Sequence, residues 1–193
     1  MTLSRPLPEV MYSPEAYLQR EQEARIKLEY FNGRITPMAG GTASHNKISA
    51  RMITALVTAL DNRPFEVYTS DMKIHIPEVN TFVYPDAVVV ALAPAFYEGR
   101  QDILTNPLLV VEVSSPSSEA YDRSLKFDYY RHIPSFQEYV VVSQDRPHVS
   151  VYTREAVDLW RMTDHPGLEG DILLRCIETR IRPEDIYKGI TFG

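Results

Sequence analysis

The sequence has one cysteine, few glycines and no long apolar run, and each scarcity excludes a class of protein. Cys176 has no partner for an intramolecular disulfide and cannot build a cysteine zinc site; Leu173 and Leu174 beside it predict a small buried residue in a strand. With 8 glycines and no glycine-rich phosphate loop, a nucleotide-binding Rossmann domain has no support. No stretch approaches the roughly 20 apolar residues of a membrane span, and the first residues lack the apolar run of a signal peptide, so we expect a cytoplasmic protein that does not enter a membrane.

Positive charge is also in the minority. The 193 residues carry a formal net charge of -6. Because neutralising phosphates requires clustered lysine and arginine, a protein that coats nucleic acid with its whole surface is excluded, and any contact with nucleic acid must be local. The composition, 44% hydrophobic and 24% charged, is that of a globular protein with a packed core. No repeat, low-complexity run or linker divides the chain, so we expect one domain over residues 1–193.

The first third of the chain predicts a helix, a hairpin and a second helix. Ser13 followed by proline and an acid has the form of a helix start, which predicts a helix over 14–24. Asn32-Gly33 is the dipeptide that best supplies the positive φ angles of a tight hairpin turn, here within 27–37. Apolar residues then recur at three- and four-residue spacing over 44–62, which is typical of an amphipathic helix.

The rest of the chain predicts a mixed sheet with helices packed on it. Short β-branched and aromatic runs predict strands at 65–68, 73–76, 82–90 and 108–113. The last two are apolar throughout, as in central strands. Ser117 or Ser118 starts a helix that runs to about His132, and a buried strand at 139–142 follows it, which implies a parallel crossover. Further strands and a short helix are expected at 149–153, around Trp160, at 172–174 and at 183–187. The fold class is therefore α/β, of the α+β kind with a mixed sheet.

Two acids lie where a buried strand has no structural need of one. Asp86 follows Tyr84-Pro85 and precedes an apolar run, and Glu112 interrupts the apolar run 109–113. A buried charge is costly unless it is paired or bound to a metal, and carboxylates on adjacent strands can share one hard cation such as Mg²⁺. Such an ion could polarise a phosphodiester and activate water. The alternative is that both acids lie at strand ends, solvated or capping turns.

Several short segments follow one another in a set order from about residue 10 to the C-terminus. They are Leu28–Gly33, Ser44-His45 at a helix start, Val83–Asp86, Leu109–Ser117, Asp122, Lys126, Tyr130 and Glu138–Val142. Each is weak alone, but the ordered set resembles the PD-(D/E)XK nuclease superfamily, and more closely the bacterial Uma-type family of restriction endonucleases. The resemblance implies a restriction-endonuclease-like core with an N-terminal helix and a β-hairpin added to it.

The resemblance also implies roles for individual residues. Asp86 matches the metal-binding aspartate that follows a proline, and Glu112 matches the acid of the second half of the motif. The superfamily places a lysine two residues after that acid, where this sequence has Ser114. In the family the lysine lies on the following helix, and Lys126 is the matching residue. Asp122 precedes it by one helical turn, so an ordinary surface ion pair is the alternative for Lys126.

Glu29 and His45 complete the candidate site. The resemblance makes Glu29, on the hairpin, an outer or water-mediated metal ligand, while the pleat of a strand leaves simple exposure equally open. His45 lies in the first turn of the long helix, whose N-terminus disfavours the imidazolium form. A neutral His45 could contact phosphate or metal-bound water, and a solvated histidine is the alternative.

Taken with the resemblance, these observations predict a nuclease that uses Mg²⁺ or Mn²⁺ to hydrolyse phosphodiester bonds of DNA. The metal would be bound by Asp86 and Glu112. The residues expected to carry the reaction are Asp86, Glu112, Lys126, Glu29 and His45. Two alternatives stay open: a catalytically silent nucleic-acid-binding domain that keeps the fold, and an interaction module in which Trp160 and nearby apolar residues form a homodimer. A homodimer is also expected of a nuclease that cuts both strands.

Overall fold

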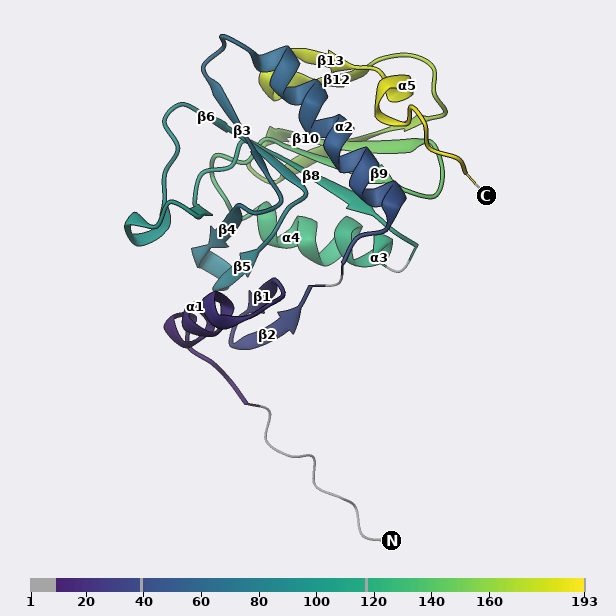
Figure 1. Ribbon diagram of the computed structural model, residues 1–193. Coiled ribbons are helices and arrows are strands. Elements are labelled where there is room, and N and C mark those ends of the chain that lie inside the picture. Colours follow the sequence, from purple (N-terminus) through teal and green to yellow (C-terminus); the bar gives the residue numbers. More distant parts are fainter. Residues whose placement is uncertain (1–9, 39, 117, 193) are drawn as a thin grey trace, which may run out of the picture.

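The computed structural model describes residues 10–38, 40–116 and 118–192, and their strands form three sheets (Figure 1). The six-stranded sheet has the order β11-β10-β9-β8-β6-β3. Its strands are β3 (Phe65–Thr69), β6 (Ala87–Ala91), β8 (Leu109–Ser114), β9 (Glu138–Ser143), β10 (His148–Ala156) and β11 (Leu159–Pro166). The five-stranded sheet has the order β2-β1-β5-β4-β7. Its strands are β1 (Leu28–Phe31), β2 (Arg34–Pro37), β4 (Lys73–Ile76), β5 (Thr81–Val83) and β7 (Ile103–Leu104). The two-stranded sheet pairs β12 (Ile172–Leu174) with β13 (Thr179–Ile181).

Helices cover both faces of the six-stranded sheet. The described helices are α1 (Pro14–Glu23), α2 (Ala43–Leu60), α3 (Glu119–Tyr121), α4 (Phe127–Tyr130) and α5 (Pro183–Ile186). A π-helical turn, Asp122–Lys126, joins α3 to α4, so the two run on as one helix. In Figure 1, α2 crosses one face of the sheet and this composite helix lies beneath the other. Within the described residues, no helix is long and apolar enough to cross a membrane.

Local sequence signals explain how the N-terminal elements begin. The backbone N–H of Ala16 donates to Ser13 Oγ at 3.2 Å, which confirms the predicted cap of α1. Asn32 and Gly33 have φ angles of 44° and 101°, the positive values that a two-residue hairpin turn requires. The expected helix and hairpin are both confirmed.

The predicted amphipathic helix is confirmed, with a small shift of its start. Thr42 is its cap, because Thr42 Oγ1 accepts a hydrogen bond from the His45 N–H at 3.1 Å, so α2 begins one residue before Ser44. The buried side chains of α2 are Ile48, Met52, Leu56 and Leu60. They pack on valines of β6, β8 and β9, and each contributes about 1.5–3 kcal/mol through burial.

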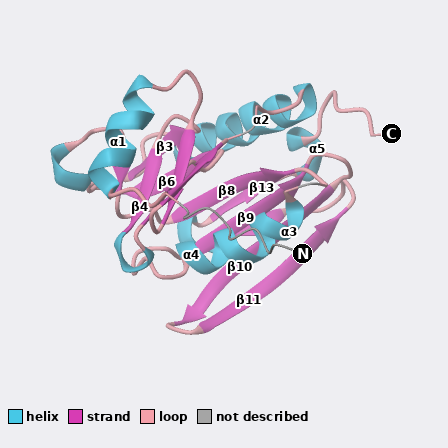
Figure 2. Cartoon of the chain, turned by 90° about the horizontal axis from the view of Figure 1, so that it is seen from below, coloured by secondary structure: helices cyan, strands magenta, loops and turns pink. Residues whose placement is uncertain are grey.

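The opposite face of the sheet carries an aromatic core. Tyr130 of α4 packs against Phe136 and Tyr139, and its ring centroid lies 5.6 Å from that of Phe136 and 5.7 Å from that of Tyr139. None of the three side chains is exposed. The composite helix follows Ser118 as expected, but the Ser118 side chain makes no cap hydrogen bond; Ser117 lies outside the described residues. The helix ends at Tyr130, two residues before the expected end at about His132. Figure 2 shows β10 and β11 along one edge of this sheet.

One predicted strand is in fact two. The apolar run 82–90 belongs to β5 of the five-stranded sheet and β6 of the six-stranded sheet, and the chain crosses between the sheets at Tyr84-Pro85-Asp86. Proline has no N–H to give to a sheet ladder, so continuous strand pairing stops there. We refer to residues 84–86 as the joint. It places Asp86 at the start of β6, beside β8.

The parallel pairing predicted around the composite helix is confirmed. β8 and β9 run parallel, and Glu112 lies opposite Val141. The short strands β7 and β13 were not predicted, because two or three residues carry no periodic signal. Cys176 was predicted in a strand, but it lies half-buried in a 3₁₀ turn, Arg175–Ile177. The prediction was wrong because the apolar run of β12 ends at Leu174.

A buried glutamate holds that turn. Glu138, at the start of β9, has no exposed surface. Its Oε1 accepts hydrogen bonds from Thr153 Oγ1 and from the Arg175 N–H, both at 2.9 Å, and its Oε2 accepts one from the Cys176 N–H at 3.1 Å. The carboxylate therefore connects β9 to β10 and to the C-terminal turn.

We expect Glu138→Ala to lower the free energy of unfolding by about 3 kcal/mol or more, because three donors lose their acceptor inside the protein. Urea unfolding followed by circular dichroism measures this loss. Glu169→Ala, at an exposed glutamate, is the matched control and should change stability by less than about 0.5 kcal/mol. Equal effects of the two substitutions would contradict the structural role of Glu138.

Candidate active site

Asp86 is fixed against β8 by two backbone contacts. Its N–H donates to the Val111 carbonyl at 3.1 Å, and its Oδ2 accepts a hydrogen bond from the Val113 N–H at 2.7 Å. The contacts flank Glu112, so both acids lie at the same end of β8. Asp86 is 5% exposed and Glu112 is 3% exposed. The structure therefore places the two acids predicted to bind metal at the same end of β8. Because both are buried, neither is the solvated acid that the alternative interpretation expected.

Glu112 faces the composite helix. Side chains alternate along β8, and Val110 packs in the aromatic core on that face. Glu112 Oε1 accepts hydrogen bonds from Lys126 Nζ at 2.8 Å and from the Tyr130 hydroxyl at 3.0 Å. The predicted lysine on the helix thus reaches the predicted acid on the strand, although Ser114 occupies the usual lysine position.

Lys126 is buried and connects the helix to the joint. It is 4% exposed, and besides Glu112 its Nζ donates to the Tyr84 carbonyl at 3.2 Å and lies 3.6 Å from Glu29 Oε1. Its ion-pair partners lie on β8 and β1, so it is not an ordinary surface pair within one helix. Burial works against the ammonium, but the surrounding carboxylates, Glu112 foremost, raise the pKa of Lys126 well above its ordinary value. Lys126 is therefore charged at neutral pH.

Glu29 is buried, which removes the alternative of simple exposure. It is 7% exposed, and its Oε1 accepts a hydrogen bond from the Tyr84 N–H at 3.1 Å. The same oxygen is the one near Lys126. Glu29 thus helps to hold both the joint and the lysine.

His45 contacts Asp86, with Nε2 to Oδ1 at 3.1 Å. This hydrogen bond raises the pKa of His45 above its ordinary value, which opposes the effect expected from the helix N-terminus. The ring is half-buried, so it is not a freely solvated histidine. Gly41 leaves room for it, because a Cβ there would lie only 2.6 Å from His45 Nδ1.

The π-helical turn explains how one helix presents three polar side chains to the same site. Asp122, Lys126 and Tyr130 are spaced by four residues, and in a regular α-helix the third would be rotated by about 80° from the first. The wider turn takes up this rotation, and all three side chains are buried. Tyr139 supports the turn by donating from its hydroxyl to the Asp122 carbonyl at 2.9 Å. Turns of this kind occur frequently at functional sites.

Asp122 and Tyr130 were not assigned a role from the sequence. Asp122 is 5% exposed, and burial raises its pKa above the ordinary value. The available signal was their four-residue spacing from Lys126, which places a polar residue on the same side of successive turns. For Asp122 that spacing suggested only the alternative of a surface pair with Lys126, and the π-helical turn has no recognisable signature in the sequence.

Acidic side chains outnumber basic ones inside this site. The four buried acids are Glu29, Asp86, Glu112 and Asp122, whereas Lys126 is the one buried lysine among them and the half-buried His45 pairs with Asp86. Burial raises the pKa of Glu112 well above its ordinary 4.5, and Asp86 and Asp122 raise it further, while Lys126 opposes them. A further cation would lower the free energy of such a cluster.

The donor set fits a hard divalent ion. Carboxylate oxygens are the ligands of Mg²⁺ and Mn²⁺, and Mg²⁺ is commonly held by one or two carboxylates with water and substrate phosphate in its other positions. In the part of the chain that the structure describes, no group of three or more His, Cys, Asp or Glu side chains could hold a metal ion. Asp86 and Glu112 could therefore hold an ion only as an open site with two carboxylates.

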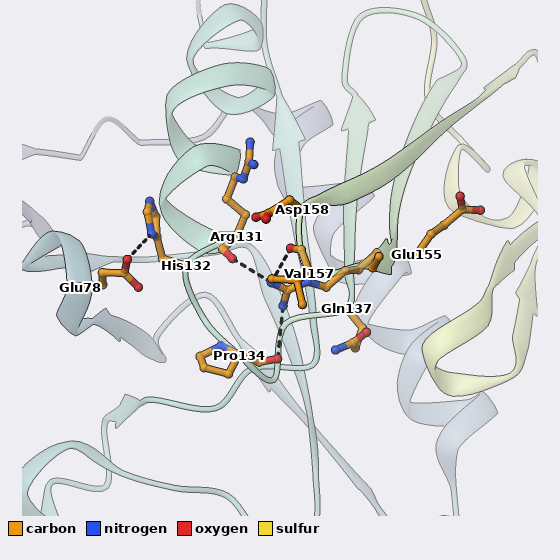
Figure 3. Close-up of a pocket in the computed structure, with 10 residues that line it drawn as sticks. Glu78, Arg131, His132, Pro134, Gln137, Glu155, Val157 and Asp158 are labelled. Atoms are coloured by element: carbon orange, nitrogen blue, oxygen red, sulfur yellow. Dashed lines mark hydrogen bonds and ion pairs between the residues drawn. The ribbon is translucent and has the colours of Figure 1, made fainter.

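A separate pocket lies beyond the C-terminal end of α4 (Figure 3). It is lined in part by Glu78, Arg131 and His132, and His132 Nδ1 lies 3.2 Å from Glu78 Oε1. Arg154, also in its lining, donates to the backbone carbonyls of Ile133, Pro134 and Phe136 at 3.3, 3.3 and 3.2 Å. The arginine is used to hold the end of the helix, and none of the predicted site residues lines this pocket.

We expect Glu112→Gln to keep or raise the Tm of the metal-free protein, because the substitution removes one of four crowded carboxylates. The folded state binds the Glu112 proton more tightly than the unfolded state, so this group's contribution to stability falls as pH rises above about 4.5. The Tm advantage of the variant should therefore be larger at about pH 8 than at about pH 5.

Scanning calorimetry at the two pH values measures this difference. Glu138→Gln is the matched control, since it makes the same change at a buried glutamate that is satisfied by three donors, and it should lower the Tm. A marked loss of stability in Glu112→Gln at neutral pH would show that Glu112 is a structural ion-pair partner of Lys126.

Comparisons with known proteins identify the family and the fold of this chain. Residues 14–180 match the Uma2 family, described as "Putative restriction endonuclease". Two relatives come from Synechocystis sp.: the uncharacterized protein sll1609 is 36% identical over 156 residues, which cover 81% of this chain and 88% of that protein. The uncharacterized protein slr1290 is 38% identical over 189 residues, which cover 98% of this chain and 97% of that protein.

A solved structure supports the fold. A crystal structure from Anabaena variabilis, described as "a putative nuclease belonging to DUF820", aligns with a TM-score of 0.75 over 93% of this chain and 99% of that chain, at 14% sequence identity. At this identity the likeness concerns the fold alone. The chain belongs to the Uma2 family and has the restriction-endonuclease-like fold that its sequence predicted.

Proposed function

We propose that this protein hydrolyses phosphodiester bonds of DNA with the help of Mg²⁺ or Mn²⁺. The observation that carries the proposal is the excess of buried carboxylates around one lysine at the joint between the sheets. A structural role alone gives no reason to bury four acids with one lysine, because each unpaired buried charge destabilises the folded state. Membership of a family described as restriction endonucleases supports the same reaction class.

In this proposal Asp86 and Glu112 hold the metal ion. When bound, the ion would polarise the scissile phosphate and stabilise the charge that develops on it. The Val113 N–H fixes the Asp86 carboxylate through its hydrogen bond to Oδ2, so this oxygen needs no rearrangement to stay in place. His45 orients the other Asp86 oxygen, Oδ1, from α2.

In the same proposal Lys126, which is paired with Glu112, supplies the positive charge beside the metal ion. Its Nζ donates to Glu112 and to the Tyr84 carbonyl, and Glu29 lies near enough to help orient it. A fixed ammonium can orient the attacking water and stabilise negative charge on the transition state. Its raised pKa keeps it in the charged form that this role requires.

The substrate and assembly follow from the same proposal. The protein would act in the cytoplasm on double-stranded DNA. Two copies related by a two-fold axis, the commonest symmetry of soluble oligomers, would cut the two strands. Light scattering with and without DNA measures whether the protein is a dimer. The alternative in which Trp160 forms the dimer has less support, because its ring packs inside the chain against Phe127 and Phe136, with centroids 5.1 and 5.3 Å away.

Cleavage of supercoiled plasmid in Mn²⁺ tests the proposed activity. We expect Lys126→Ala to reduce the cleavage rate by roughly 10² or more, the scale of losing one electrostatic donor, with little change in metal affinity. Lys126→Met keeps apolar volume at the buried position and serves as a second variant if the alanine protein is unstable. Lys188→Ala, at an exposed lysine, is the control and should cleave at the wild-type rate.

Restoring the usual position of the lysine gives a sharper result. Ser114→Lys in the Lys126→Ala background should recover part of the cleavage, because position 114 follows Glu112 on the same face of β8. Wild-type cleavage by Lys126→Ala would remove the lysine from the proposed mechanism. A wild-type protein that binds Mn²⁺ and DNA without cutting would instead support a catalytically silent binding domain.

A further inference from the structure

Tyr84, at the joint, lies between two ionic clusters, each of which contains a buried lysine. Its backbone belongs to the candidate site, since the N–H donates to Glu29 at 3.1 Å and the carbonyl accepts from Lys126 at 3.2 Å. Two residues later the chain supplies Asp86. Tyr84 is 3% exposed, and the following proline restricts the backbone on its C-terminal side. The conformation of Tyr84 thus determines where three of the site's charged groups are held.

The second cluster holds the Tyr84 side chain. Lys73 of β4 donates from Nζ to the Tyr84 hydroxyl at 3.1 Å, and the hydroxyl in turn donates to Glu21 of α1. Lys73 Nζ is also 2.9 Å from both Glu21 Oε2 and Asp102 Oδ2. Arg100 completes the cluster by contacting Asp102 Oδ2 at 2.7 Å.

The lysine of this cluster is buried as deeply as the lysine of the candidate site. Lys73 is 3% exposed, and Lys126 is 4% exposed. The ring of Tyr84 also lies within reach of two ammonium groups, with Lys27 Nζ 5.1 Å and Lys73 Nζ 5.2 Å from its centroid. Buried ion pairs contribute little net stability, but they allow few alternative arrangements. Their effect here is to restrict the position of one tyrosine.

We propose that Tyr84 is a positioning residue, whose hydroxyl, held by Glu21 and Lys73, fixes the joint that orients Glu29, Lys126 and Asp86. The inference rests on the proposed function for its catalytic consequence. It gives the N-terminal helix a role in the site through Glu21, and it gives β4 of the five-stranded sheet a role through Lys73, beside β1, which supplies Glu29. The geometry of the joint can nevertheless be measured without any catalytic assay.

The first test is Tyr84→Phe, which removes the hydroxyl and keeps the ring. We expect kcat for DNA cleavage to fall at least tenfold with KM changed less than twofold, because the substrate still binds while the catalytic groups are misplaced. Tyr187→Phe is the matched control: it deletes another buried hydroxyl, bonded to the Ser143 and His148 carbonyls at 3.0 and 2.8 Å. That variant should lose comparable Tm and keep kcat. Equal kcat values for the two variants would overturn the proposal.

The second test does not depend on activity. Hydrogen exchange should accelerate at least tenfold at the amides of positions 84 and 86 in Tyr84→Phe, since these amides donate to Glu29 and Val111, and stay unchanged in Tyr187→Phe. Glu21→Gln changes no residue of the joint, but it should accelerate exchange at the same two amides. If the wild type does not cleave DNA but the exchange changes as expected, the proposed function fails and the positioning stands. Unchanged exchange at these amides in Tyr84→Phe and in Glu21→Gln would refute the positioning role of Tyr84 even if the wild type cleaves.

Discussion

Lys126 lies 2.8 Å from Glu112 in an interior that also buries Glu29, Asp86 and Asp122, and this imbalance of charge constrains the rest of the structure. Several elements contribute to it: β8 and the start of β6 supply acids, the hairpin supplies another, and the composite helix supplies the lysine. Each side chain is restrained by packing or by hydrogen bonds to backbone. The fold therefore holds several acidic side chains close together, although they would move apart in a flexible chain. Such a cluster of acids is typical of a site for a cation.

The two buried glutamates on the parallel strands show that burial alone does not indicate function. Glu138 and Glu112 lie on neighbouring strands, yet Glu138 accepts three hydrogen bonds from groups that would otherwise have no acceptor. Glu112 shares Lys126 with Glu29 and accepts one further hydrogen bond, from the Tyr130 hydroxyl, and burial raises its pKa. The two carboxylates differ in whether the surrounding hydrogen-bond donors and cations compensate for the loss of water. A satisfied acid is part of the architecture, and an under-compensated acid indicates a missing positive charge.

Much of this arrangement could be predicted from residues with strong local signals. Asn32-Gly33, the apolar stripe of α2 and the apolar runs of β8 and β9 specify their own structures, and Asp86 and Glu112 stand out as acids beside such runs. The split of residues 82–90 between two sheets, the π-helical turn and the cluster around Lys73 depend on contacts between distant segments. Local sequence patterns do not contain that information. The hydrogen bond between His45 and Asp86 was missed for the same reason, because the two residues are neighbours only in the folded chain.

A divalent ion should bind at the end of β8 that carries Asp86 and Glu112. Anomalous diffraction from crystals soaked in Mn²⁺ measures this directly. We expect one strong anomalous peak in contact with both carboxylates, at ligand distances of about 2.0 to 2.6 Å, and its loss in crystals of Asp86→Asn. A peak bound only by other residues, or an equal peak in Asp86→Asn, would contradict the account.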